Sequence, residues 1–512
     1  MRDKYLLVFD AGTGAGRCSI FDLKGSLAAV DYCEWNYVTP YENKEIREFI
    51  PADFWEILSR VARGALAKAG IDPNQVIGVT STSQREGVVI IDKGGQEIYA
   101  GPNIDFRGEV QGKWLHENFG PEMYEISGHW PSAMTAPARL LWFKEHKPHL
   151  YKRMHALMMI NDWILYRLTG EVASEPSNAC ETLFFNIHTM AWDYDLIDKL
   201  GVNPMLFPKI LRSGDQLGLV SEKAAAATGL KAGTPVFMGG ADTQCALLAT
   251  GGLKEGHTAI VSGTSTPVQA VVKEPLLDGK ARVRTGCYLP AGSWVIDSNA
   301  RPTGVVYRWL RDTFYANDCA GAADLYEVMN KEAAAVPPGS EGLVAFGGPS
   351  ILNVSDQRDF PNMFFGIKPG YEKELCRRGL FARSILENIA FAVRGNIEQI
   401  YDLLNYKPPY VYMTGGAAKS ALQLEIMANV LGLPIHVAQG EESTSLGAAI
   451  CGAVGAGVFA DFDRAVAAMV RPAAVVEPRP LLTGEYEKHY RRWKKLYDYM
   501  TENINALTNN LN

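Results

Sequence analysis

The sequence predicts an α/β protein made of two related halves, and three observations lead to this prediction. Apolar runs typical of buried strands alternate along the chain with segments of helical apolar spacing. A strand, a turn rich in Gly and hydroxyl residues and a second strand open the chain at residues 6–22, and the same pattern returns at residues 258–272. A chain of 512 residues is also too long for one ordinary hydrophobic core. We therefore predict domains over residues 1–250 and 251–512, which face each other across a cleft.

Composition narrows the classes of partner. The net charge of -7, without a long basic run, argues against nucleic acid or an anionic membrane surface. The Cys residues are scattered and form no C-x-x-C pair, which is typical of reduced thiols in a cytoplasmic protein. We find no signal peptide and no apolar run of membrane-spanning length. A small phosphate-bearing ligand and a homodimer are both compatible with this composition.

The predicted elements alternate in both halves. In the first half, we predict strands at residues 27–35, 76–82, 88–91 and 235–238, helices at residues 53–69, 138–144 and 154–168, and a polar loop at residues 174–182. In the second half, we predict strands at residues 258–261, 268–272 and 411–414, and helices at residues 304–313, 322–335, 378–404, 422–431, 442–454 and 486–507.

The turn of the opening hairpin carries more glycine than a turn requires. Gly12 and Gly14 flank Thr13, and glycine permits the positive φ angles of tight turns. Backbone N–H groups without side chains in the way also form a cradle for phosphate oxygens. Asp10, at the end of the first strand, is suited to hold a metal ion that accompanies the phosphates. The alternative is a purely structural hairpin in which Asp10 caps the turn.

Four Gly-rich turns follow predicted strands, around Gly12, Gly240, Gly263 and Gly415. One such turn is weak evidence, but four of them, two in matching positions of the halves, favour a nucleotide-binding cleft. Phosphoryl transfer there needs donors for the phosphoryl group, a metal ion and an acid that takes the proton of the acceptor. Asp242 follows a strand and two glycines, which suits that base. The alternative for Asp242 is a helix N-cap.

Gln84-Arg85-Glu86 lies between two predicted apolar strands. Donor and acceptor groups side by side suit a polyhydroxylated substrate, and such a site rejects analogues that lack a hydroxyl. Asp105 and Arg107 would extend the same network. The alternative is a structural ion pair.

The chain resembles the FGGY family of carbohydrate kinases over nearly its whole length. The resemblance rests on Asp10-Ala-Gly-Thr-Gly, Gln84-Arg85-Glu86, Asp105-Phe-Arg107, Leu168-Thr169-Gly170, Gly239-Gly240-Ala-Asp242, Gly263-Thr264-Ser265, Gly415-Gly416-Ala417 and Glu442-Ser-Thr-Ser-Leu-Gly447. It implies an actin-like fold of two ribonuclease-H-like domains that close on ATP and a sugar. It also implies Asp242 as the base and Asp10 near Mg²⁺.

The expected site residues fall into groups. The catalytic residue is Asp242, and the metal ligand is Asp10. The expected substrate-binding residues are Gln84, Arg85, Glu86, Asp105, Arg107, Asn178, Asp242 and Gln244, with loop structure as an equal alternative for Asn178. The expected ATP-binding residues are Gly12, Thr13, Gly14, Arg17, Gly263, Thr264, Gly415, Gly416 and Ala417. The resemblance implies that the two hairpins hold the phosphates and that the stretch 415–417 lies near adenosine.

Within the family, the motifs are most similar to those of autoinducer-2 kinases, which phosphorylate the linear dihydroxypentanedione on a terminal hydroxyl. The expected reaction is transfer of the ATP γ-phosphate to a primary hydroxyl of a small linear sugar. A xylulokinase-, ribulokinase- or glycerol kinase-like enzyme is the alternative, and a non-catalytic actin-like nucleotide-binding protein is a more distant one. The sequence departs from the family pattern at Gly16 and over residues 347–360.

Overall fold

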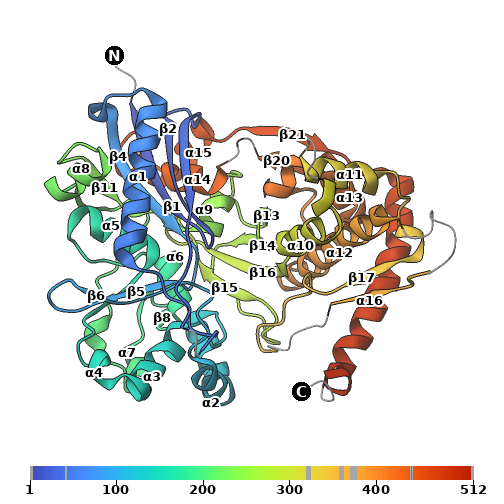
Figure 1. Cartoon of the computed structure of the whole chain (residues 1–512), viewed down its shortest axis with the longest axis horizontal. Helices are drawn as coiled ribbons and strands as arrows, with labels where there is room; N and C mark the ends of the chain where they lie inside the picture. Colours follow the sequence, from blue (N-terminus) through green and yellow to red (C-terminus); the bar gives the residue numbers. More distant parts are fainter. Residues whose placement is uncertain are drawn as a thin grey trace. The chain divides into compact units, whose positions relative to one another are not determined.

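The computed structural model describes residues 4–40, 43–318, 324–356, 362–368, 377–438, 440 and 442–508 (Figure 1). The chain forms two compact units, and each unit is made of several segments. The first comprises the residues up to 255, residues 271–296 and residues 442–471. The second comprises residues 256–270 and 297–441 and the residues from 472 onward. The predicted boundary near residue 250 stays a prediction.

The first unit is centred on a mixed sheet with the strand order β10-β11-β4-β1-β2-β3, in which β12 also pairs with β4. Its strands are β1 (Tyr5–Ala11), β2 (Ala15–Asp22), β3 (Leu27–Glu34), β4 (Val76–Ser83), β10 (Gln216–Leu219), β11 (Pro235–Phe237) and β12 (Gly240–Ala241). β1 runs antiparallel to β2 and parallel to β4, and Asp10 lies opposite Arg17 in the hairpin. The predicted hairpin and third strand are confirmed.

Helices cover both faces of this sheet because side chains alternate along β1. Leu7 and Phe9 pack in one buried cluster with residues of α1 (Pro51–Ala69) and α5 (Ile160–Thr169). Leu6 lies on the other face, toward α14 (Ser443–Gly455), where a Cβ on Gly452 would lie 3.5 Å from its Cδ2 atom. α1 ends at Gly70, which has the left-handed conformation common at helix C-termini.

The remaining elements of the first unit form a smaller region around a three-stranded sheet, β6-β5-β7, and a two-stranded sheet, β8-β9. The strands of these two sheets are β5 (Val88–Ile91), β6 (Glu97–Gly101), β7 (Ala156–Met159), β8 (Phe185–Asn186) and β9 (Ala191–Trp192). The strand β15 (Arg284–Cys287) lies in the same unit but belongs to neither sheet. The helices of the rest of the unit are α2 (Glu109–Ser127), α3 (Ala136–His146), α4 (Pro148–Tyr151), α6 (Pro176–Ala179), η2 (Cys180–Thr182), α7 (Tyr194–Lys199), α8 (Glu222–Thr228), α9 (Asp242–Leu248) and α15 (Phe462–Met469).

Two sequence predictions in this region are wrong. The helix expected over residues 154–168 is a strand, β7, followed directly by α5. The run is uniformly apolar there, so its periodicity does not separate a buried strand from a buried helix. The loop expected over residues 174–182 contains the short helices α6 and η2.

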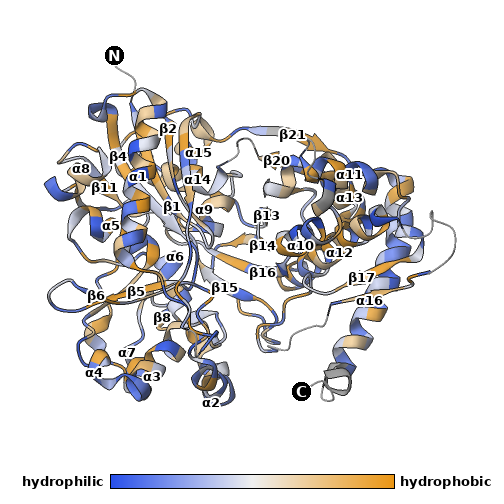
Figure 2. Ribbon diagram, viewed as in Figure 1, coloured by the Kyte–Doolittle hydropathy of each residue, from blue (hydrophilic) through white to orange (hydrophobic). Residues whose placement is uncertain are grey.

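The second unit contains a sheet in which the strands follow one another as β16-β14-β13-β19-β20-β21. They are β13 (Thr258–Ser262), β14 (Ser265–Val272), β16 (Trp294–Pro302), β19 (Val411–Gly415), β20 (Ile435–Ala438) and β21 (Pro472–Val476), with β17 (Val344–Phe346) and β18 (Met363–Phe365) in a separate hairpin. The helices are α10 (Gly304–Phe314), α11 (Leu325–Ala334), α12 (Arg378–Leu404), η7 (Gly416–Lys419), α13 (Ala421–Leu431) and α16 (Pro480–Thr508). Figure 2 shows hydrophobic residues along β14 and large hydrophilic stretches on α16, as expected for a core strand and a surface helix.

The predictions for this unit are confirmed for most elements. The predicted helix over 378–404 has the bounds of α12. The helix predicted over 322–335 begins at Leu325, and positions 322 and 323 lie outside the described residues. Positions 357–360 of the departure noted at 347–360 also lie outside them. In the described part of the chain, no helix is long and apolar enough to cross a membrane.

The two sheets share one strand order. β3-β2-β1-β4-β11 in the first unit corresponds to β16-β14-β13-β19-β20 in the second. In each, the opening hairpin is antiparallel and its first strand pairs in parallel with the next strand. The repeat predicted from the two strand–turn–strand patterns is confirmed.

The glycines of the first hairpin do not serve the turn in the predicted way. Gly12, Gly14 and Gly16 are absent from the described glycines with positive φ, so the prediction of a left-handed turn is wrong. Gly16 is required for a different reason, because a Cβ there would lie 2.6 Å from the Trp35 ring. Trp35 stacks on Phe54 of α1, so the departure from the family pattern at this position makes room for an aromatic cluster.

Candidate active site

Asp242 is the first residue of α9, directly after β12. The N-cap position is Ala241, so Asp242 does not have the capping role considered as its alternative. Its Oδ1 atom accepts a hydrogen bond from the Thr243 N–H at 2.7 Å. Desolvation raises the pKa of Asp242 to about 7; nearby Arg85 opposes this shift and Asp10 adds to it. A carboxylate with a pKa near neutrality is well matched to accept a proton at physiological pH.

Buried polar contacts anchor the backbone at the start of α9. The Ser177 hydroxyl accepts a hydrogen bond from the Ala241 N–H at 2.9 Å and donates one to Glu175. A Cβ on Gly240 would lie 2.9 Å from the Ser177 hydroxyl oxygen and 2.2 Å from Leu289 Cδ2. Glycine is therefore required at position 240 by packing, and the turn holds Asp242 in place.

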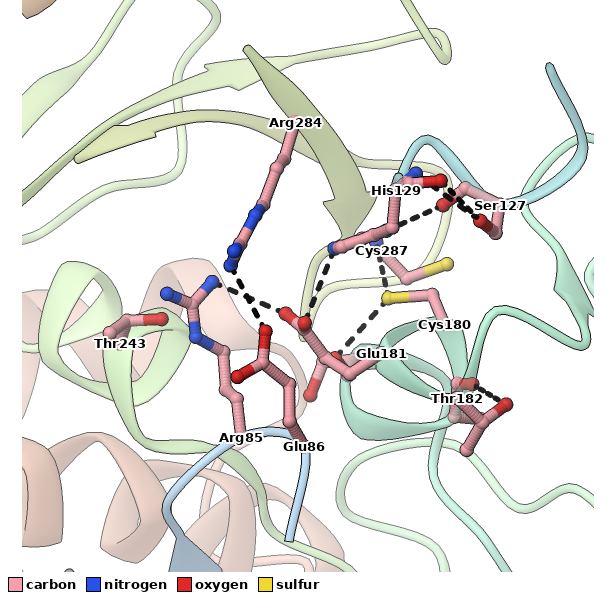
Figure 3. Close-up of polar contacts among 12 residues, drawn as sticks. Arg85, Glu86, Ser127, His129, Cys180, Glu181, Thr182, Thr243, Arg284 and Cys287 are labelled. Atoms are coloured by element: carbon pink, nitrogen blue, oxygen red, sulfur yellow. Dashed lines mark hydrogen bonds and ion pairs between the residues drawn. The ribbon is translucent and has the colours of Figure 1, made fainter. Parts of the chain in front are cut away.

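Arg85 and Glu86 follow β4, where polar side chains project beyond the end of the strand (Figure 3). Glu86 has a φ of 64°, a left-handed conformation that costs about 1–3 kcal/mol for a residue with a side chain. Arg85 Nη1 lies 3.2 Å from Glu181 Oε1. Glu86 Oε1 lies 3.3 Å from Arg284 Nη1. The two side chains therefore have separate partners, Glu181 for Arg85 and Arg284 for Glu86.

Three residues of this cluster have no counterpart in the sequence predictions. Glu181 has no exposed side-chain surface and faces both Arg85 and His129, whose Nε2 lies 3.3 Å from Glu181 Oε2. Glu181 lies in the polar stretch 174–182, which offered a weak signal. His129 and Arg284 stand alone in their segments, and nothing in the sequence separates them from ordinary surface residues.

Gln84 ties the first hairpin to its neighbours. Its Nε2 atom donates to the Gly12 carbonyl at 3.3 Å, and its Oε1 atom accepts from the Asn103 N–H at 3.1 Å. The Tyr37 hydroxyl lies 3.3 Å from the same Nε2 atom. These contacts give Gln84 a structural role, and its contact with substrate stays a prediction.

Asp105 and Arg107 form a buried network of their own. Arg107 Nε lies 2.7 Å from Asp105 Oδ2, and Arg107 Nη2 lies 2.6 Å from Glu48 Oε1. The guanidinium also lies over the rings of Tyr99, at 4.6 Å from the centroid, and of Trp142, at 5.0 Å. The pair is therefore fully engaged within the protein, and its contact with substrate stays a prediction.

Asn178 and Gln244 are also buried. Asn178 Nδ2 donates to Asn161 Oδ1 at 2.8 Å, while its Oδ1 atom has no hydrogen-bond partner among the described residues. Gln244 Oε1 accepts from the Thr243 hydroxyl at 2.7 Å. Gln244 follows Asp242 on the first turn of α9, whereas Asn178 belongs to α6. Their contact with substrate stays a prediction.

The first hairpin combines a buried acid with an exposed loop. Asp10 is 4% exposed, and Arg17 Nη1 lies 3.7 Å from its Oδ2 atom. Burial raises the pKa of Asp10, and Arg17 opposes the shift. The Thr13 carbonyl accepts hydrogen bonds from Trp35 Nε1 and the Tyr37 hydroxyl.

The loop between the strands is open. The hydrogen bonds of the described residues include none from the N–H groups of Thr13 and Gly14. No heavy atom lies within 4 Å of a Cβ built on Gly14, and the nearest to one on Gly12 is at 3.6 Å. Neither φ nor packing demands glycine at these two positions. Their lack of side chains leaves room for a ligand at the backbone.

The second hairpin repeats this arrangement in the second unit. The Gly263 N–H donates to the Ser265 carbonyl at 2.9 Å, as the Gly12 N–H donates to the Ala15 carbonyl at 3.0 Å. A Cβ on Gly263 would meet only an ordinary contact at 3.7 Å, and one on Gly416 would meet nothing. Gly415 differs, because its φ is 93° and a Cβ would lie 2.0 Å from the Ser262 carbonyl oxygen.

The family can now be assigned from comparison with known proteins. Residues 5–249 match the N-terminal domain of the FGGY family of carbohydrate kinases, and residues 258–456 match its C-terminal domain. The chain belongs to this family. It is a carbohydrate kinase, an enzyme that transfers a phosphoryl group to an alcohol group, with the predicted fold of two actin-like, ribonuclease-H-like domains.

Named relatives refine the comparison. The chain is 33% identical to the autoinducer-2 kinase of Escherichia coli K12 over 505 residues, which cover 96% of this chain and 94% of the relative. An autoinducer-2 kinase of Salmonella paratyphi A matches at the same identity and coverage.

Solved structures show the same fold. A xylulose kinase from Lactobacillus acidophilus superposes with a TM-score of 0.86 at 20% identity, covering 97% of this chain and 98% of the other. A glycerol kinase from Plasmodium falciparum superposes with a TM-score of 0.81 at 17% identity, covering 97% and 98%.

Proposed function

We propose that this carbohydrate kinase transfers the γ-phosphate of ATP to a primary hydroxyl of a small linear sugar, with Asp242 as the catalytic base. The observation that supports it most directly is a carboxylate at the start of α9 whose pKa is raised to about 7 beside the Arg85 guanidinium. In this proposal Asp242 accepts the hydroxyl proton as the oxygen attacks phosphorus. Arg85 and Glu86 orient the other oxygens of the acceptor by donating and accepting hydrogen bonds.

The first hairpin fits ATP and Mg²⁺ on two observations. Its loop N–H groups and open glycines suit phosphate oxygens, and Asp10 is a buried carboxylate at the base of the loop. No group of three or more metal-ligating side chains occurs among the described residues. Mg²⁺ at phosphate sites usually takes one or two protein carboxylates and completes its coordination with phosphate oxygens and water, so a single carboxylate such as Asp10 is compatible with it. Bound MgATP supplies the phosphoryl group and neutralises its developing charge.

Each unit carries residues that we propose for nucleotide contact. Thr13, Gly14 and Arg17 would bind phosphate oxygens in the first unit. Gly263, where a Cβ would meet only an ordinary contact, and Thr264 would do so in the second. Residues 415–417 would lie near adenosine.

The proposed acceptor is dihydroxypentanedione, the autoinducer-2 precursor. Its support is the 33% identity to autoinducer-2 kinases over nearly the whole chain. The structural neighbours are below 25% identity, so they support the fold and do not select among ketopentoses, glycerol and dihydroxypentanedione.

A screen of acceptors tests the proposal. ADP release with MgATP should be fastest, by kcat/KM, with dihydroxypentanedione, and slower with xylulose, ribulose, glycerol and tetritols. A higher kcat/KM with a ketopentose or glycerol would replace the proposed acceptor. If none of the acceptors in the panel supported ADP release, the kinase proposal in this form would be contradicted.

The Arg85→Ala variant tests the proposed role of Arg85 and Glu86 in binding the acceptor. We expect the acceptor KM to rise roughly tenfold to a hundredfold, because a buried donor to the substrate is lost, while the ATP KM changes less than about twofold. Arg153→Ala is the matched control, because Arg153 pairs with Asp92 on the surface. Equal changes in both KM values would make Arg85 a structural residue.

A further inference from the structure

The Arg85-Glu86 pair is held from two sides by residues that the proposed function does not use. Arg85 Nη1 lies 3.2 Å from Glu181 Oε1, and Glu86 Oε1 lies 3.3 Å from Arg284 Nη1. Glu181 comes from η2 and Arg284 begins β15 (Figure 3). Because Glu86 has a left-handed backbone, its place depends on the groups that hold it.

His129 stands behind Glu181. Its Nε2 atom lies 3.3 Å from Glu181 Oε2, and its Nδ1 atom lies 2.7 Å from the Ser127 carbonyl oxygen. Both neighbours are hydrogen-bond acceptors, and a neutral imidazole has a single N–H to donate. A doubly protonated ring donates to the Ser127 carbonyl from Nδ1 and places its positive charge 3.3 Å from Glu181 Oε2, a contact with the geometry of an ion pair and not of a hydrogen bond. Burial lowers the pKa of His129, but the Glu181 carboxylate outweighs this and raises it to about 9.

We propose that the His129 imidazolium is a positioning residue of the acceptor site: it holds Glu181 in the orientation that fixes Arg85, while Arg284 fixes Glu86. The proposal rests on the proposed role of Arg85 and Glu86 in acceptor binding. His129 and Arg85 together lower the pKa of Glu181, so Glu181 stays a carboxylate between two cations. Without the imidazolium, Glu181 keeps only one of these two cationic partners and holds Arg85 in a less fixed orientation.

Several charged or titratable groups face this cluster from the elements packed against it. They are Cys180 and Glu181 of η2, Arg284 and Cys287 of β15, Arg85 and Glu86 after β4, and Asp242 of α9. Burial raises the pKa of Cys287 well above its usual range. The His129→Gln variant therefore identifies the contribution of His129, and Cys180→Ser is the control for the neighbouring side chain.

The kinetic test follows the acceptor KM between pH 7 and pH 10. We expect His129→Gln to raise the acceptor KM about tenfold at pH 7.5, with the ATP KM within about twofold. The wild-type acceptor KM should rise toward that of the variant above pH 9, whereas the KM of His129→Gln should stay flat. His188→Gln is the matched control, because His188 is exposed and contacts a backbone carbonyl. Cys180→Ser should keep the wild-type rise.

Three kinetic outcomes would overturn the inference. They are an unchanged acceptor KM in His129→Gln, equal rises in both KM values, and loss of the pH-dependent rise in Cys180→Ser. For the contact between Arg284 and Glu86, Arg284→Ala should raise the acceptor KM, and Arg284→Lys should bring the KM most of the way back to the wild-type value. A Lys variant no better than Ala would remove Arg284 from the positioning role.

A measurement without turnover keeps the inference separate from the proposed function. NMR of the intact protein labelled at its histidine ring carbons should show one ring, absent in His129→Gln, that titrates near pH 9. In Glu181→Gln its midpoint should fall by at least one pH unit. A wild-type midpoint near 6.5, or no shift in Glu181→Gln, would overturn the inference. If no acceptor is phosphorylated in the screen, the proposed function fails while this readout still decides the state of His129.

Discussion

The hairpins that open the two sheets share a backbone design and differ in charge. Each is closed by a glycine N–H, from Gly12 in the first and Gly263 in the second. Two residues before that glycine stands Asp10 in the first hairpin and Val261 in the second. The second hairpin is lined by hydroxyls instead, with Thr266 Oγ1 lying 2.7 Å from Thr303 Oγ1. The same hairpin backbone therefore occurs once beside a carboxylate and once beside neutral side chains.

The same contrast extends to the surroundings of each hairpin. In the first unit, Arg85 follows β4, Asp242 follows β12 and Glu181 lies in η2. Arg85 opposes the raised pKa of Asp242, Glu181 adds to it, and Arg85 lowers the pKa of Glu181. In the second unit, the matching loops offer Thr264 and Gly416. With the roles proposed above, one copy of the duplicated fold would carry the proton and metal chemistry, and the other would supply uncharged contacts to phosphate.

The largest expected effect is the loss of kcat in Asp242→Asn, which lies in the first unit. Loss of a general base should lower kcat by about 10²–10⁴-fold, while the Kd for ATP changes little. Steady-state kinetics and nucleotide titration measure the two quantities. Thr264→Val, the contrasting change in the neutral hairpin, should mainly raise the ATP KM. A kcat loss below tenfold in Asp242→Asn, or a kcat loss as large in Thr264→Val, would contradict the assignment of the catalytic base to the first unit.

The next effect concerns Asp10. If its carboxylate holds Mg²⁺, Asp10→Asn should raise the free Mg²⁺ needed for half-maximal activity by about 10- to 100-fold, as is typical when a group of a metal site is lost. Asp31→Asn provides the control, because Asp31 lies on the same sheet and pairs with Lys68 on the surface. Unchanged Mg²⁺ dependence in Asp10→Asn would leave Asp10 a structural acid.

The next prediction concerns the pH dependence of kcat/KM, which should follow the protonation of Asp242. Asp242 must be deprotonated to accept a proton, and its pKa is raised to about 7. The kcat/KM for acceptor should therefore fall about tenfold per pH unit below pH 7 and level off just above it. Because Asp10 raises the pKa of Asp242, Asp10→Asn should move this limb to lower pH. A limb near pH 4 in the wild type would contradict the assigned environment.

The smallest effects separate glycines that serve a ligand from glycines that serve the fold. Gly14→Ala and Gly263→Ala should leave the melting temperature unchanged and raise the ATP KM a few-fold, because only open space surrounds a Cβ at 14 and an ordinary contact meets one at 263. Gly16→Ala should instead destabilise the protein by about 1–3 kcal/mol through the clash with Trp35. A thermal-shift series with ATP titrations distinguishes the two classes, and a stable Gly16→Ala would contradict the packing argument.

Sequence patterns predicted the fold where periodicity is long and punctuated. α12 spans 27 residues with regular apolar spacing, and its bounds were predictable. The apolar run through Met159 and Ile160 has no breaker between β7 and α5, so the strand was hidden. Whether such a segment forms a strand or a helix is decided by its pairing with distant strands of the sheet, which the local sequence does not contain.

The site shows the same limit. Asp242 and the Arg85-Glu86 pair stand out because charges follow apolar strands and glycines. Their partners do not, because Glu181 is 96 positions from Arg85 and no local pattern links them. Which buried acid meets which cation is decided by how the loops after β4 and after α2 are brought together with η2.

α14 carries a consequence for synthesis of the chain. It belongs to the first unit, and Ser445 meets Ser19 of β2 across 426 positions of sequence, with a hydrogen bond of 3.2 Å. On the ribosome, the face of β1 that bears Leu6 therefore waits for almost the whole polypeptide before it is covered. We expect a nascent chain halted near residue 250 to expose that face and to need chaperone protection until the last segments emerge.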